Sequence, residues 1–134
     1  MRKTDREEIA QWLDGMMALS KEYDLIVFRL SSSWQKGAVS YNEVFAEGEL
    51  PTLLEKVRGM PIPRESKCKS AKKNFEKAID AQEKGRAALA KYGEGLTISS
   101  RMWTQQIMFW LDTSEIFQKA MAKDCVSLGK RYQI

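Results

Sequence analysis

The sequence predicts an all-α fold, an antiparallel bundle of three long helices plus one or two short ones. Two observations indicate it. Apolar residues recur at helical spacing over three long segments, and all three prolines and most glycines fall between those segments. With 134 residues, 43% of them hydrophobic and 30% charged, residues 1–134 are expected to form a single helical-bundle domain with a sizeable core.

The first long helix is predicted from Thr4 to about Leu30. Thr4 and Glu7 have the spacing of a capping box, and Ser31, Ser32 and Ser33 are expected to end the helix. Residues 25–28 are rich in strand formers, but the unbroken apolar period favours a helix there. The two apolar series of this helix are Ile9, Leu13, Met16, Tyr23, Val27 and Leu30, and Trp12, Leu19 and Ile26.

The middle of the chain, residues 34–60, predicts one or two short helices. Ser40 and Glu43 form a second capping-box pattern, which opens a short helix through residues 44–45. Pro51 suits a first helical position and Gly59 a C-terminal cap, which predicts another short helix between them. Residues 61–63, Pro-Ile-Pro, are expected to be extended.

The long helix at residues 64–92 has a narrow inner face on which small side chains dominate. Glycines at positions 93 and 95 close it. Small side chains let a neighbouring helix approach closely, so this helix is expected to pack tightly. The inner face consists of Cys68, Ala71, Phe75, Ala78, Ile79, Gln82, Gly85, Leu89 and Tyr92.

The last long helix is predicted to begin after Thr97, Ser99 or Ser100 and to end at about Leu128, before Gly129. Its main apolar stripe is Trp103, Ile107, Trp110, Ser114, Phe117, Met121 and Leu128. A second stripe lies about 100° away and consists of Met102, Phe109 and Ile116.

That second stripe indicates a helix that is apolar on more than one side. Either this helix is central in the bundle with the short helices of residues 34–59 covering it, or another chain covers the stripe. We therefore predict a protein partner or a homodimer that docks on Met102, Phe109 and Ile116. Trp34, in the interrupted segment, is a further candidate anchor for a partner.

A lysine stripe on helix 64–92 indicates a different kind of partner. Lys73, Lys77, Lys84 and Lys91 fall within about 40° of one another on a helical wheel. Such a row can follow nucleic-acid phosphates without reading sequence. It is more typical of a solvated helix face with pairs such as Asp80 and Lys84, and the net charge of +4 is mild.

Several catalytic chemistries are excluded by composition. The chain has no histidine, which removes Ser-His-Asp sites and histidine-ligated metals. Two cysteines cannot make a disulfide framework or a four-cysteine zinc site, and they are expected to be isolated thiols. Two acidic pairs, Asp80 with Glu83 and Asp112 with Glu115, have the spacing that could hold Mg²⁺ in a phosphohydrolase. No cofactor and no metal site is predicted, because a helical wheel turns these acids away from the core.

The sequence accordingly predicts a non-enzymatic helical-bundle interaction protein, an adaptor or small subunit of a larger complex that can self-associate. The alternative is a sequence-independent nucleic-acid-binding accessory subunit that uses the lysine stripe. A magnesium-dependent phosphohydrolase is less favoured. No apolar stretch approaches the ~20 residues of a membrane span, and no signal-like segment follows the charged start, so a soluble cytoplasmic protein is expected.

Overall fold

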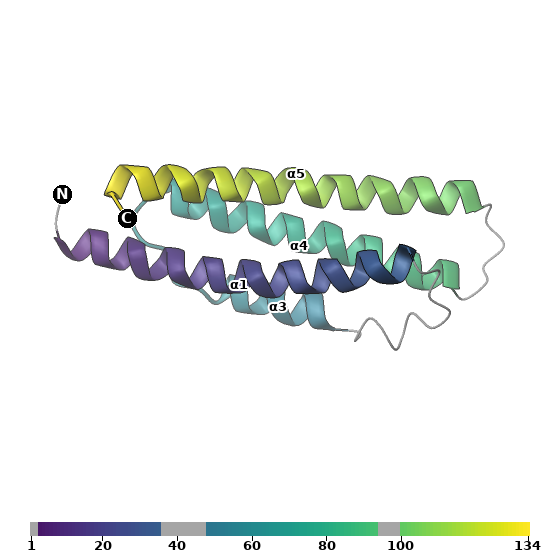
Figure 1. The fold of residues 1–134 in the computed structure, drawn as a ribbon. Coiled ribbons are helices and arrows are strands. Elements are labelled where there is room, and N and C mark those ends of the chain that lie inside the picture. Colours follow the sequence, from purple (N-terminus) through teal and green to yellow (C-terminus); the bar gives the residue numbers. More distant parts are fainter. Residues whose placement is uncertain (1–2, 36–47, 94–99) are drawn as a thin grey trace.

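The computed structural model describes residues 3–35, 48–93 and 100–134, and the side chains within 5–29, 48–88 and 105–134. These residues form four helices and no strand, which confirms the all-α prediction. In Figure 1 each of the four runs opposite to the one before it, which gives an antiparallel bundle. The helices are α1 (Lys3–Gln35), α3 (Glu49–Arg58), α4 (Ser66–Gly93) and α5 (Ser100–Tyr132).

Helix α1 is longer than predicted at both ends. It begins at Lys3, so Thr4 lies within the helix rather than at its cap, and it continues to Gln35. The prediction that the three serines at 31–33 end the helix is wrong. Serine disfavours a helix by only a few tenths of a kcal/mol, and three in a row need not stop one. The helical interpretation of residues 25–28 is confirmed.

Helix α3 is the predicted short helix, displaced by two residues at its start. Gly48 precedes it with φ of 103°, a conformation that glycine adopts without strain, and its carbonyl accepts the first helical bond, from Thr52 N at 2.9 Å. Pro51 therefore lies at the third helical position. Gly59 caps the other end as predicted, donating to the carbonyl of Glu55 at 3.0 Å. The predicted helix at residues 40–45 lies outside the described residues.

The two remaining helices lie where they were predicted, and their ends differ by a few residues. Helix α4 begins at Ser66, two residues after the predicted start at Arg64, and the carbonyl of Glu65 accepts from Cys68 N at 3.0 Å. Helix α5 passes through Gly129 and ends at Tyr132, so the prediction that it stops before Gly129 is wrong. A glycine inside a helix costs only about 1 kcal/mol relative to alanine, which the packing of neighbouring residues can offset.

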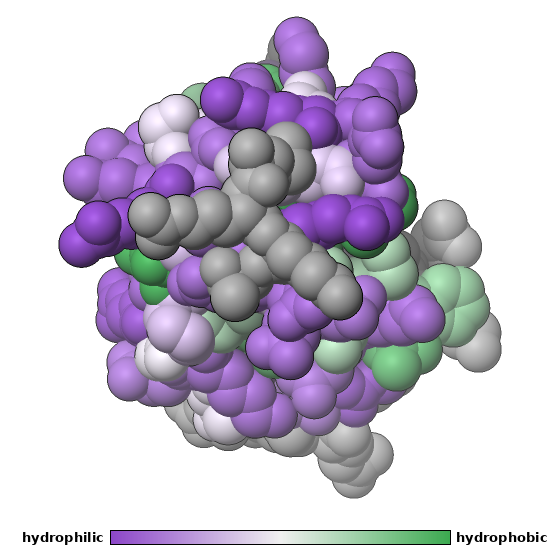
Figure 2. Space-filling view, turned by 90° about the vertical axis from the view of Figure 1, so that its left-hand side faces the viewer, coloured by the Kyte–Doolittle hydropathy of each residue, from purple (hydrophilic) through white to green (hydrophobic). Residues whose placement is uncertain are grey.

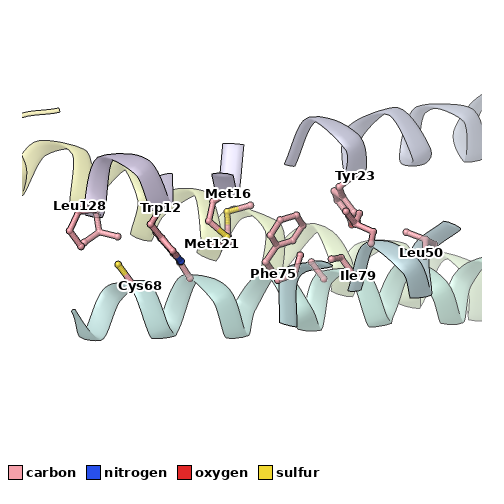
Figure 3. Close-up of a cluster of buried hydrophobic side chains, with 14 residues drawn as sticks. Trp12, Met16, Tyr23, Leu50, Cys68, Phe75, Ile79, Met121 and Leu128 are labelled. Carbon is pink, nitrogen blue, oxygen red and sulfur yellow. The ribbon is translucent and has the colours of Figure 1, made fainter. Parts of the chain in front are cut away.

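The core lies where α1, α3 and α5 meet the inner face of α4. Figure 3 shows Trp12 and Tyr23 of α1 extending toward Cys68 and Phe75 of α4. The Tyr23 and Phe75 rings meet edge to face with centroids 5.8 Å apart. Helices α4 and α5 share the most extensive contact in the bundle. The predicted inner face of α4 is buried from Cys68 to Gly85; the side chains of Leu89 and Tyr92 lie outside the described ranges.

A buried polar cluster ties three helices together. Gln82 of α4 is 1% exposed, and its Oε1 accepts from Ser114 of α5 at 2.9 Å and from Tyr23 of α1 at 3.5 Å. Burial raises the pKa of Tyr23 to about 12, so its hydroxyl keeps the proton that it donates. Because a buried polar group is costly without its partner, this cluster favours one alignment of α1, α4 and α5.

A second set of bonds holds the helix ends where α1 begins and α5 ends. Glu65 accepts from the Tyr132 hydroxyl at 2.6 Å and pairs with Arg131 at 3.3 Å. Arg6 donates to the carbonyls of Tyr132 and Gln133 at 3.1 and 2.9 Å. Figure 2 looks onto this end and shows mostly hydrophilic side chains, with apolar ones in small patches.

The carboxyl of Glu65 should make stability depend on pH. Its side chain is only 7% exposed, and the Tyr132 hydroxyl, above all, holds the pKa of Glu65 below its usual value. A lowered pKa stabilises the fold above the unfolded-state pKa, and this contribution is lost as pH falls through the folded-state pKa. Tyr132→Phe should therefore destabilise the protein more at pH 7 than at pH 3.

Urea unfolding at the two pH values measures this difference. Glu65→Gln serves as the matched variant, because it removes the titrating group and should flatten the same pH dependence. Equal destabilisation by Tyr132→Phe at pH 7 and pH 3 would contradict the assignment.

Candidate functional site on helices α4 and α5

Two large apolar side chains lie exposed on the outside of α5. Phe109 and Ile116 are 59% and 66% exposed, and their seven-residue spacing places them on one face, about 10 Å apart along the helix. The opposite face of α5 is packed into the bundle through Ile107 and Ser114. Met102 continues the spacing in α5, although its side chain lies outside the described ranges. We call Met102, Phe109 and Ile116 the α5 outer row.

Two aromatic residues of α5 lie between this row and helix α4. Trp110 and Phe117 directly follow Phe109 and Ile116 in the sequence and are half-buried. The ammonium of Lys84 lies 4.8 Å from the centroid of the Trp110 ring, and that of Lys77 lies 5.3 Å from the Phe117 ring. Both distances are typical of cation–π contacts.

These contacts repeat with the period of the two helices. One set joins Lys84 to Trp110, whose ring meets Phe109 edge to face at a centroid distance of 4.9 Å. The other joins Lys77 to Phe117, the neighbour of Ile116. Because α4 and α5 are antiparallel, a step of seven residues forward on α4 matches seven residues backward on α5. The lysine stripe and the α5 outer row therefore border one continuous surface.

The four lysines of the predicted stripe differ in their surroundings. Lys84 pairs with Asp80 at 3.1 Å, as the solvated-face interpretation expects. Lys77 contacts the Phe117 ring, and Lys73 is exposed; neither has an ion pair with a described side chain. The side chain of Lys91 lies outside the described ranges, at the α4 position that would match Trp103 and Met102 in the same period. The stripe thus places the exposed ammonium group of Lys77 next to the α5 outer row.

Trp34, the other predicted partner anchor, lies in the last turn of α1. Its side chain falls outside the described ranges, so its role stays a prediction.

The acidic pairs mostly engage neighbouring cations on their own helices. Glu83 binds Arg86 through both oxygens, at 2.8 and 2.7 Å, and Glu115 pairs with Lys119 at 2.9 Å. In the described part of the chain no three carboxylate or thiol side chains gather as a metal site would need. The geometry therefore adds no support to a magnesium centre.

Both cysteines are unpaired thiols, as the sequence predicts. Burial raises the pKa of Cys68 to about 12 and that of Cys125 to about 11. The thiolate, rather than the thiol, is the nucleophile, so neither side chain is activated for catalysis.

One feature of the surface could not be predicted from the sequence patterns. A groove of about 400 Å³ lies between α1 and α5, and the buried residues Met16 and Met121 are among those that line it. Small side chains, Ser20 and Ala122, line it where larger ones would fill it. Finding it requires the spacing between α1 and α5, which no periodicity along a single helix contains.

Comparison of the chain with protein-family models, with curated proteins and with solved structures finds no match. Among the described residues, no helix combines the length and the apolar character needed to cross a bilayer.

Proposed function

We propose that this protein is a non-enzymatic interaction protein, an adaptor or small subunit of a larger assembly, which associates with a second copy through the α5 outer row. One observation carries the proposal. Phe109 and Ile116 are exposed on the same face of a helix whose other face already packs in the core. The exposed apolar face of this helix therefore has no packing partner among the described helices.

The surroundings of the row resemble the anatomy of a binding surface. Single exposed apolar residues are ordinary, but here Trp110 and Phe117 extend the apolar area toward α4. Aromatic and aliphatic anchors carry much of the binding energy in protein interfaces. Lys77 and Lys84 supply a charged rim beside them, as polar rims surround interface cores.

Light scattering across a range of protein concentrations tests the proposal. The mass of the wild-type protein should rise above 15.4 kDa as concentration increases. Ile116→Glu should weaken this association about tenfold or more, equivalent to ~1.4 kcal/mol, because it places a charge in the apolar contact. Helix content measured by circular dichroism should stay unchanged, since Ile116 is 66% exposed.

Ile62→Glu is the matched control. Ile62 is 46% exposed in the segment between α3 and α4, outside both α1 and α5, so the same chemical change there should leave association intact. A wild-type protein that remains monomeric throughout, or equal effects of the two variants, would rule out the α5 outer row as the interface.

Nucleic-acid binding is the second candidate, and a specific observation supports it. Lys73 and Lys77 are exposed, one turn apart, and neither is neutralised by a described acidic side chain. This candidate predicts that labelled single-strand and duplex oligonucleotides gain anisotropy with the protein, and that binding weakens steeply with salt. Lys73→Glu with Lys77→Glu should abolish it; unchanged affinity would remove the candidate.

A further inference from the structure

The outward face of α1 carries a column of residues with the same spacing as the outer face of α5. Glu7, Asp14, Lys21 and Phe28 follow one another at seven-residue intervals, and all four are exposed. We call them the α1 outer column. On α5, the row of Phe109 and Ile116 continues at the same interval into Lys123 and Lys130, which are also exposed. We call these four residues the α5 outer column.

The two columns have opposite charges at corresponding ends. The α1 column begins with the acids Glu7 and Asp14, and the α5 column finishes with Lys123 and Lys130. None of these four forms an ion pair with another described side chain, whereas acids elsewhere on α1 do, such as Glu22 with Lys56. Each column therefore presents unneutralised charge at one end and an exposed phenylalanine at the other, 68% exposed in the case of Phe28.

An antiparallel alignment of the two columns matches them at every position. Phe28 meets Phe109, and the alkyl chain of Lys21 meets Ile116. In the same register Asp14 meets Lys123 and Glu7 meets Lys130. Aromatic pairing, apolar contact and two opposite-charge pairs then fall in one line, the arrangement that sets partner choice between helices.

The alignment agrees with the way that α1 and α5 already face each other within one chain. There Arg6 bonds the carbonyl of Tyr132, and Asp24 accepts from Gln118 at 2.8 Å. The register between chains differs from this internal register by only a few residues. Two copies can therefore stand side by side with their long axes parallel and with little offset along the bundle.

We propose that the α5 outer column of one copy binds the α1 outer column of a second copy. This inference rests on the proposed function and names the surface that receives the α5 outer row. The contact is heterologous, so a pair of copies keeps one free column of each kind, and further copies add until a ring closes or an open array forms. A parallel contact between two α5 columns is disfavoured, because it would place Lys123 and Lys130 opposite the same two lysines of the second copy.

Charge reversal tests the pairing in the full-length protein. One variant carries Lys123→Glu and Lys130→Glu; the other carries Glu7→Lys and Asp14→Lys. Each variant alone places like charges opposite each other and should associate about tenfold more weakly than the wild type in sedimentation velocity at low salt. An equimolar mixture should recover association, because each column then meets a complementary one.

A variant with all four reversals should also recover association, since both columns change sign together. Lys69→Glu, an exposed site on α4 outside both columns, is the control and should have no effect. Circular dichroism checks that each variant keeps its helices, which all of these exposed substitutions should preserve.

The outcomes separate this inference from the proposed function. Two outcomes would show that α1 is not the receiving surface, although the α5 outer row remains an interface. In the first, Ile116→Glu weakens association but the α1 variant does not. In the second, Ile116→Glu weakens association but the mixture stays dissociated. If the wild type does not associate, both ideas fail. Recovery in the mixture and in the fourfold variant supports the α1–α5 contact between copies.

Discussion

The close approach of α4 to α5 is the constraint on which the rest of the structure depends. It is made by Ala81, Gly85 and Ala88, which lie on one face of α4 and are buried. A Cβ at Gly85 would lie 3.4 Å from the Trp110 Cβ and 3.4 Å from a methyl group of Leu111. The backbones are so near that a bulky α5 side chain has no room between them. Trp110 consequently lies at the edge of the contact, half-buried, where Lys84 reaches its ring.

The position of the aromatic residues in turn determines what α5 presents to its surroundings. With Ile107 and Ser114 directed inward, the residues on the far side of the helix have no cover from the described helices. Phe109 and Ile116 are among those residues. The outer row is thus a consequence of how tightly the inner side packs, and the lysines of α4 are brought to its border by the same packing. The buried Gln82 cluster then aligns α1 with this pair.

Much of the fold follows from periodicity, because an apolar series of 3.6-residue period identifies both a helix and its buried side. The inner faces of α4 and α5 are instances, and so is the exposure of Phe109 and Ile116. Helix ends were less predictable. Serines at 31–33 and Gly129 weaken a helix only slightly, and neighbouring contacts decide whether it continues.

Relations between helices could not be predicted from one helix at a time. The lysine stripe and the apolar row looked like rival features, because only the register between α4 and α5 shows that Lys77 reaches Phe117, next to Ile116. The groove beside Met121 likewise depends on how two distant segments, α1 and α5, lie together.

The free energy of unfolding of Ala81→Leu tests the central claim, that close α4–α5 packing positions the outer face. Ala81 is 3% exposed, one turn from Gly85, and three added carbon atoms would push the helices apart. We expect a loss of about 1–3 kcal/mol in urea unfolding, together with weaker self-association, although residue 81 is buried away from the proposed contact. Unfolding and association indistinguishable from the wild type would contradict the account.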